Sequence, residues 1–185
     1  YCTEEVSDHA CAMLLALSRG LPLHDRNIRR GIYDYHAAKC LPDLRQGVLG
    51  IVGFGRIARR VIQKMRPFCR EIQVASRAGA AEIAAAGGVK RSFDQVIAQA
   101  DYLCIHTPGT PENYHLFNRA VFQKMKMGAC LVNVARGSVL CEEDLAAALR
   151  SGHLACAALD VFEEEPLPPE SPLRLRWAGS YSQLV

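Results

Sequence analysis

Short apolar runs alternate with segments of helical periodicity from residue 48 onward. An apolar run bounded by turn residues is typical of a buried strand, and apolar positions at helical spacing are typical of a packed helix. Their regular alternation predicts βαβ units and thus an α/β fold, a doubly wound parallel sheet with helices on both faces. The expected strands are 49–52, 72–75, a short one near 89, 102–106, 129–134 and 154–159, and the expected helices are 56–68, 80–86, 93–98, 119–124 and 142–151.

Two helices are predicted ahead of the first strand. Thr3 is a capping-type residue that precedes an apolar pattern of helical spacing, and Gly20 and Pro22 are expected to end that helix. A second, more polar helix is predicted around 24–30, and 42–46 is expected to be a connecting loop. The apolar positions of the first helix are Val6, Ala10, Met13, Leu14 and Leu17.

Composition excludes several classes of function. The net charge of +3 comes from 22 basic and 19 acidic residues without a basic block, so we expect no nucleic-acid partner. No apolar run reaches the roughly 18 residues that a membrane span requires, and the first residues do not resemble a signal peptide, so we expect a soluble, cytoplasmic protein without a membrane partner. The eight cysteines lack C-x-x-C spacing and the histidines lack metal-ligand spacing, which predicts packed, reduced thiols and no metal site.

A glycine fingerprint follows the first predicted strand. Gly53, Gly55 and Ala58 form a G-x-G-x-x-A pattern between the apolar run 48–52 and a helix. In a Rossmann-like fold the first small residue allows a tight turn, the second allows backbone N–H groups to approach a pyrophosphate, and the third lets helix and strand pack closely. The pattern predicts a dinucleotide at the start of this helix.

Two residues after the second strand bear on the choice of cofactor. An acidic residue about 20 positions beyond the glycines selects NAD, but here Ser76 and Arg77 occupy that place. A hydroxyl and a guanidinium would suit the 2′-phosphate of NADP. Arg77 is equally compatible with a solvated loop charge beside bound NAD, so both cofactors remain open.

Six motifs lie along the chain: YCTEEV at 1–6, LGIVGFGRI at 49–57, HTP at 106–108, NVARG at 133–137, ALDVF at 158–162 and EP at 165–166. In this order and spacing they resemble the D-isomer-specific 2-hydroxyacid dehydrogenases. The resemblance implies an NAD(P)-dependent enzyme that acts on a small 2-oxo or 2-hydroxy acid and forms a homodimer, with an interface to which Val6, Met13 and Leu17 could contribute. It also implies a substrate domain ahead of residue 1 that this chain does not include.

The same resemblance divides the chain and assigns catalytic roles. Residues 1–30 would be linking helices, 31–173 the dinucleotide-binding domain, and 174–185 a divergent or truncated tail. Arg136 would grip the substrate's carboxylate and carbonyl, which a planar, permanently charged fork can do bidentately. Glu165 would be the acidic partner that raises the pKa of a catalytic histidine.

The remaining roles carried over concern the cofactor. Arg56 and Ile57 would lie under the pyrophosphate, and Thr107 and Pro108 near the middle of the cofactor. Val134, Ala135 and Asp160 would line the nicotinamide end, and the chemistry of hydride transfer would be the cofactor's own.

One departure from the family pattern limits the expected activity. The family's histidine belongs to a Pro-His motif after the Glu-Pro pair, whereas this sequence has no histidine after His153. His106 is expected to be packed at a strand end rather than to replace it. We therefore expect cofactor binding with little or no turnover. A dinucleotide-sensing protein similar to the transcriptional corepressors is the alternative, and a formate dehydrogenase is less favoured because those enzymes carry an amide where Glu165 stands.

Overall fold

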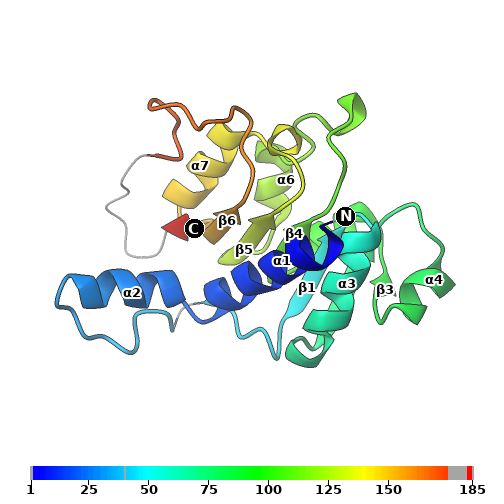
Figure 1. Ribbon diagram of the computed structural model, residues 1–185, viewed down its shortest axis with the longest axis horizontal. Coiled ribbons are helices and arrows are strands. Elements are labelled where there is room, and N and C mark those ends of the chain that lie inside the picture. Colours follow the sequence, from blue (N-terminus) through cyan, green and yellow to red (C-terminus); the bar gives the residue numbers. More distant parts are fainter. Residues whose placement is uncertain (1, 40, 175–182, 185) are drawn as a thin grey trace.

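The computed structural model describes residues 2–39, 41–174 and 183–184, and it forms one parallel sheet (Figure 1). Every strand pair is parallel, in the order β3-β2-β1-β4-β5-β6-β7. The predicted doubly wound sheet is thus confirmed. The strands are β1 Val48–Val52, β2 Glu71–Ala75, β3 Val89–Lys90, β4 Tyr102–Ile105, β5 Ala129–Asn133, β6 Leu154–Leu159 and β7 Gln183–Leu184.

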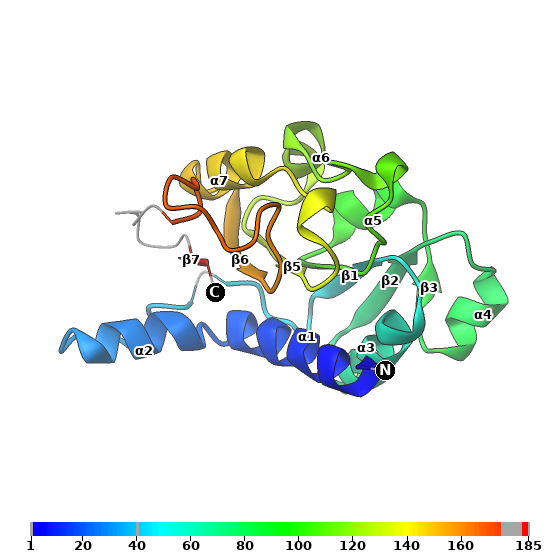
Figure 2. The same ribbon diagram turned by 45° about the horizontal axis from the view of Figure 1, so that its top comes forward.

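Helices cover both faces of the sheet, as Figure 2 shows with α1 and α3 below it and α5, α6 and α7 above it. Alternating strand residues supply the two cores: Ile51 and Cys104 pack on the α1 and α3 side, and Leu103 and Ile105 on the other. The helices are α1 Thr3–Ser18, α2 Leu21–Arg29, α3 Arg56–Met65, α4 Ala80–Ala85, α5 Phe93–Gln99, α6 Arg119–Lys124 and α7 Glu142–Arg150, with 3₁₀ turns η1 Arg66–Phe68, η2 Pro111–Asn113 and η3 Gly137–Val139.

The strand order locates the place for a ligand. From β1 the chain moves outward to β2 and β3, and then returns to the other side of β1 as β4. The helices that follow β1 and β4 therefore leave on opposite faces, and a crevice opens at the carboxyl ends of these two strands.

Charged residues fix α1 to α3, the helix that begins at the glycine turn. The Arg60 guanidinium donates to the Glu4 carboxylate at 2.6 and 2.9 Å, and Lys64 Nζ lies 2.7 Å from both Asp8 Oδ1 and the Oγ of buried Ser7. Hydrogen bonds from Arg60 and then Lys64 lower the pKa of Glu4 to about 2. The first two turns of α1 are consequently held against the second half of α3.

The start and end of the first predicted helix differ from expectation. Thr3 is the first helical residue rather than a cap, and Cys2 precedes it with φ 55° and no capping hydrogen bond from its side chain. Pro22 does not end α1 but lies in the first turn of α2, where its missing N–H costs no helical bond. The second helix therefore begins at Leu21, three residues earlier than predicted. Similarly, α3 gives way to a 3₁₀ turn at Arg66, because Pro67 cannot donate to the helical ladder.

Other predictions about the ends of the chain have different outcomes. The division at residues 30 and 173 stays a prediction, although Leu14 and Leu17 of α1 share a core with Leu49 of β1. Most of the predicted tail, 175–182 and 185, lies outside the described residues, and 183–184 pair with β6. Within the part of the chain that the structure describes, no helix is long and apolar enough to cross a membrane.

Candidate active site

A cleft of about 1390 Å³ opens at the carboxyl ends of the central strands. It is lined by the turns that follow β1, β2, β4 and β5, together with the first residue of α1. The structure places most of the predicted site residues in this one cleft: Gly53, Gly55, Arg56, Ile57, Ser76, Arg77, Thr107, Pro108, Val134, Ala135 and Arg136. Asp160 and Glu165 are not among its lining residues.

The turn after β1 requires glycine at its first position. Gly53 has φ 102°, and a Cβ there would lie 2.4 Å from the His106 carbonyl oxygen. Its N–H donates to the Ala75 carbonyl of β2 at 2.9 Å. The turn is therefore pressed against the ends of both neighbouring strands, which directs the chain sharply into α3.

The start of α3 is open toward the cleft. Gly55 is the N-cap residue, no side chain caps the helix, and a Cβ on Gly55 would meet nothing within 4 Å. Ala58, one turn into the helix, is fully buried against the sheet. Unpaired N–H groups and the positive end of the helix dipole form an anion site, so this surface fits a dinucleotide pyrophosphate.

Neighbouring side chains support this loop from outside the cleft. The Arg59 guanidinium lies 4.1 Å from the centre of the Phe54 ring and forms an ion pair with Glu82 on α4. A cation over an aromatic face is attracted by the ring's quadrupole. These contacts fix the Phe54 side chain, which lies between Gly53 and Gly55 in the sequence.

The far end of the cleft, beyond β2, is basic. The Ser76 hydroxyl accepts the N–H of Ala78 at 2.9 Å, which turns the chain so that Arg77 is exposed. Lys90 and Arg91, which sequence reasoning missed, line the cleft as well. Lys90 is the last residue of the short strand β3 and Arg91 follows it, so only the pairing of β3 with β2 brings them beside Arg77.

The turn after β5 is organised by a buried amide. Asn133, 1% exposed, accepts the N–H of Ala135 at 3.0 Å and donates to the carbonyl of Arg136 at 3.0 Å. The Arg136 guanidinium donates to the Ala135 carbonyl at 2.7 Å, and its stem lies against Gly109. The guanidinium is thereby placed on the cleft wall opposite the glycine turn.

Glu165 is linked to this turn through the backbone of another loop. A Cβ on Gly137 would lie 1.8 Å from the Phe162 carbonyl oxygen, so the segment after β6 passes directly over Gly137. The Phe162 N–H in turn donates to Glu165 Oε1 at 3.0 Å. The structure thus connects the loops of Arg136 and Glu165, while the Glu165 carboxylate is turned toward its own loop.

Asp160 faces the first helix. Its Oδ1 lies 3.3 Å from His9 Nε2 on α1, and its N–H donates to the Asn133 carbonyl at 3.0 Å. Asp160 therefore lies directly after β6, beside the turn of Arg136, with a His9 partner that the sequence pattern did not indicate.

A second cluster ties the loops after β4 and β6 together. Glu163 Oε1 accepts the Tyr114 hydroxyl at 2.9 Å and lies 2.7 Å from His115 Nε2, and the two rings stack at 3.9 Å. His115 also donates its N–H to the Ser138 carbonyl at 2.9 Å. Residues 48 positions apart meet here, so sequence spacing could not reveal the cluster.

His106 lines the cleft with an uncharged side chain. Its Nε2 lies 3.2 Å from the buried Cys104 sulfur, and burial lowers the pKa of His106 to about 4. The imidazole is therefore neutral at pH 7, with one ring N–H and without the second, acidic proton of an imidazolium. Next to it, the buried Thr107 hydroxyl donates to the Val52 carbonyl at 3.2 Å and joins the ends of β1 and β4.

The fold and this cleft define a dinucleotide-binding domain. More specifically, the chain belongs to the D-isomer specific 2-hydroxyacid dehydrogenases, because the model of their NAD binding domain matches residues 11–178. It is 39% identical over 179 residues to a Neurospora crassa formate dehydrogenase, covering 91% of this chain and 46% of that protein. A glyoxylate reductase from Aeropyrum pernix is 38% identical over 178 residues, covering 92% and 53%. The chain thus spans about half the length of these relatives.

Solved structures share the fold over nearly the whole chain. An NAD-dependent formate dehydrogenase from Staphylococcus aureus in complex with NAD matches with a TM-score of 0.89 and 30% identity, covering 100% of this chain and 55% of that one. A probable 2-hydroxyacid dehydrogenase from Rhizobium etli in complex with NADP gives a TM-score of 0.84 and 27% identity, covering 98% and 57%. The prediction of NAD or NADP as cofactor is therefore confirmed at the level of the family.

Proposed function

We propose that the complete protein interconverts a 2-oxo acid and the corresponding 2-hydroxy acid, using NADH or NADPH. The observation that carries this proposal is that the open amino end of α3 and the Arg136 guanidinium share one cleft. The first binds phosphate without a charged side chain, and the second binds a carboxylate and polarises a carbonyl. When bound, the nicotinamide supplies or accepts the hydride.

This chain's own residues would hold the reactants in place. The backbone at Gly55, Arg56 and Ile57 would bind the pyrophosphate, and Val134 and Ala135 would limit the nicotinamide end of the cleft. Arg136 would anchor the acid. Glu165 would stabilise the protonated form of the family's catalytic histidine, which favours proton donation to a developing alkoxide.

Cofactor binding is the first test. Titration of NADH and of NADPH into the folded chain should give a saturable change in nicotinamide fluorescence. Absence of saturation with both would refute the proposed function. In the complete protein, Arg136→Gln should leave this signal in place. It should weaken the binding of a 2-oxo acid analogue such as oxamate by about a hundredfold, which is the scale of a lost charged, bidentate pair. Arg70→Gln, an exposed change outside the cleft, is the matched control.

The basic end of the cleft supports a preference for NADPH. Arg77, Lys90 and Arg91 gather where a 2′-phosphate would lie, and a phosphate forms charge-assisted hydrogen bonds with such groups. Arg77→Gln should weaken NADPH binding by about tenfold, equivalent to about 1.4 kcal/mol, and leave the affinity for NADH unchanged. Equal losses for both cofactors would show that Arg77 does not distinguish them.

We also propose a homodimer, with a different surface from the one first expected. Met13 and Leu17 are buried in the core, so α1 offers little to a partner. The exposed apolar residues instead lie on α2 and in the segment after it, and α2 extends beyond the sheet in both ribbon views (Figures 1 and 2). They are Leu21, Ile28, Ile32, Tyr33 and Tyr35, between 49% and 83% exposed.

Light scattering tests the dimer directly. The chain should elute with the mass of two copies at micromolar concentration, and Ile28→Glu should convert it to a monomer, because the charge would be desolvated in the interface. Met127→Glu changes an apolar residue elsewhere that is even more exposed, 83% against 59% for Ile28, and should have no effect. A monomeric unmodified chain would contradict the dimer for this segment without affecting the proposed chemistry.

A further inference from the structure

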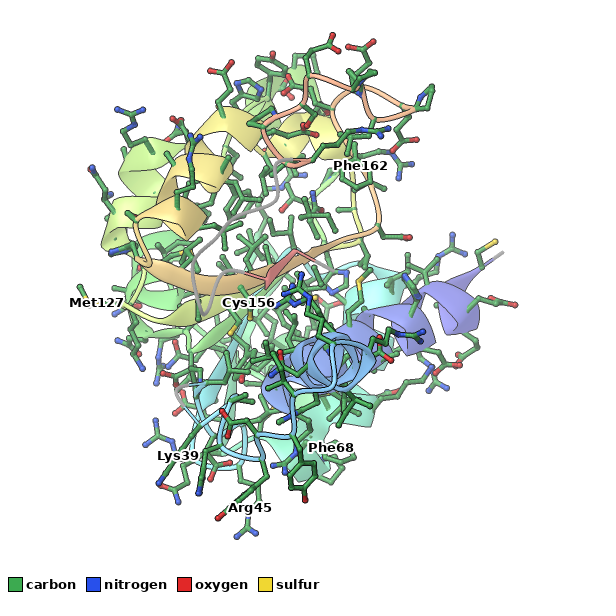
Figure 3. All side chains as sticks on the ribbon, turned by 90° about the vertical axis from the view of Figure 1, so that its left-hand side faces the viewer. Lys39, Arg45, Phe68, Met127, Cys156 and Phe162 are labelled. Carbon is green, nitrogen blue, oxygen red and sulfur yellow. The ribbon has the colours of Figure 1, made fainter. Side chains whose placement is uncertain are left out.

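Two cysteine side chains meet in the core between β5 and β6. Cys130 Sγ and Cys156 Sγ lie 3.0 Å apart, and the two residues are 0% and 1% exposed. The distance exceeds that of a disulfide bond, about 2.05 Å, but the sulfurs touch without an intervening atom. Cys156 is labelled in Figure 3, well inside the molecule, whereas Phe162 farther along the same segment lies in the loop toward the top of the view.

A register shift sets the two cysteines opposite one another. Ala129 pairs with Leu154, but the next pair is Cys130 with Cys156, so Ala155 is bypassed. Paired residues of parallel strands point to the same face, and neighbouring strands lie about 4.7–4.9 Å apart. A disulfide spans Cα separations of about 4.4–6.8 Å, so the backbone spacing already suits a bond.

Tyr102 extends this row on the neighbouring strand. It pairs with Cys130 and donates its hydroxyl to the Pro42 carbonyl at 2.7 Å, which ties the loop before β1 over the row. Burial, with smaller contributions from the two cysteines, raises the pKa of the Tyr102 hydroxyl, so it stays a proton donor. Bulky reagents are thus kept from the thiols, and a reagent close to water in size is the kind that can reach them.

We propose that Cys130 and Cys156 form an oxidative modification site at which a hydroperoxide closes a disulfide across β5 and β6. In the first step one sulfur attacks a peroxide oxygen of hydrogen peroxide, the O–O bond breaks, and a sulfenic acid and water form. In the second step the other sulfur attacks the sulfenic sulfur, the S–O bond breaks and a second water leaves. The two thiols together lose two electrons and two protons, and the peroxide is reduced to two waters.

The position of this bond gives it a structural consequence. β5 continues into the turn of Arg136, and β6 continues into the loop of Glu165. A disulfide would join these two strands covalently near their amino-terminal ends, several residues before the turns that form the cleft. The site is independent of the proposed dehydrogenase function, since neither thiol lines the cleft.

Thiol mapping of the unmodified, folded chain tests the proposal. After treatment with hydrogen peroxide and removal of the excess, the chain is unfolded without a reductant, alkylated, digested and analysed by mass spectrometry. Cys130 and Cys156 should lose alkylation together and appear as a cross-linked peptide pair, lighter by two hydrogen atoms than the separate peptides. Cys104 is the internal control because it is also 0% exposed but lies beside His106, and it should remain alkylatable.

Several results would overturn the site. One is that Cys104 loses its alkylation at the same rate as the pair, and another is that disulfides are spread among many cysteines. A third is that Cys130 and Cys156 stay fully alkylated while the exposed Cys2 is oxidised. A variant provides a second test: Cys156→Ser should abolish the cross-linked peptide pair, whereas Cys141→Ser should leave it intact. The experiment on the unmodified chain decides the matter even if Cys156→Ser does not fold.

Discussion

Two turns at the same edge of the sheet form the candidate site, and they are built differently. The turn after β1 offers backbone groups: Gly53 packs against the His106 carbonyl, and α3 presents its first N–H groups. The turn after β5 presents one side chain, Arg136. It is held by the buried Asn133 and by Gly137, which has the Phe162 backbone directly over it.

The difference shows what each kind of recognition demands. A phosphate cradle needs small residues at fixed, short spacing, so the pattern that makes it also reveals it. A carboxylate anchor needs only one arginine, and its placement depends on segments that arrive from other strands. Steric and ionic changes in the two turns should therefore have separable effects, the largest of them on stability.

The largest effect is expected in the arginine turn. Gly137→Ala would place a methyl group 1.8 Å from a backbone oxygen, so whole loops must move, and we expect a loss of about 3–5 kcal/mol in the free energy of unfolding. Urea denaturation measures this loss. Gly79→Ala is the control, because a Cβ there meets nothing within 4 Å. Equal stability of the two variants would mean that the Phe162 loop does not rest on Gly137.

The glycine turn should be next. Gly53→Ala combines a positive φ of 102° with a contact of 2.4 Å to the His106 carbonyl, which predicts a loss of about 2–4 kcal/mol and of cofactor binding. Thermal unfolding and an NADH titration report the two effects separately. An alanine variant that still binds the cofactor with unchanged affinity would show that this turn is not the cradle.

The free energy of unfolding should depend on pH through His106, whose carbonyl lies against the glycine turn. Because the pKa of His106 is about 4 when folded and near 6.5 when unfolded, the unfolded chain takes up the proton first as pH falls. The stabilisation is complete above pH 6.5 and disappears as pH falls toward 4, by about 1–3 kcal/mol for this part-buried group. His106→Gln should flatten the dependence of unfolding free energy on pH over that range, whereas exposed His36→Gln should not.

The smallest effect on stability is expected at Gly55. Its φ is negative and a Cβ there points into open space, so Gly55→Ala should change the free energy of unfolding by less than about 0.5 kcal/mol. The added methyl group would nevertheless occupy the space of the pyrophosphate and weaken NADH binding by about tenfold or more. Calorimetric titration measures this affinity. Unaltered binding would place the phosphates elsewhere.

The fold was largely predictable because its signals are local. Apolar runs, turn residues and the glycine spacing each report on neighbours along the chain, and the strands were located within about one residue at most ends. The errors fell mostly at helix boundaries, and β7 was not predicted. The sequence reading used Thr3 as a cap and Pro22 as a stop, whereas packing of α1 on α3 and the missing N–H of proline place both residues in first turns.

The candidate site was predictable only in part. The glycine spacing indicated Gly53 and Gly55, and the position after the second strand indicated Ser76 and Arg77. The other predicted site residues, Asp160 and Glu165 among them, were assigned by resemblance. Periodicity did not indicate the His9 partner of Asp160, the Glu163 cluster, or the basic pair Lys90 and Arg91. Each of these depends on long-range pairing, which leaves no regular interval in the chain.

The amino-acid sequence by itself determined a parallel sheet with a tight glycine turn after its first strand, because strand burial, helix periodicity and glycine geometry are properties of short segments. Only the tertiary structure decided which distant groups meet: the Phe162 backbone over Gly137, the Tyr114 and His115 pair on Glu163, and Cys130 against Cys156. The physical reason is that these contacts arise from strand order and register, which the whole sheet sets through packing of both of its faces.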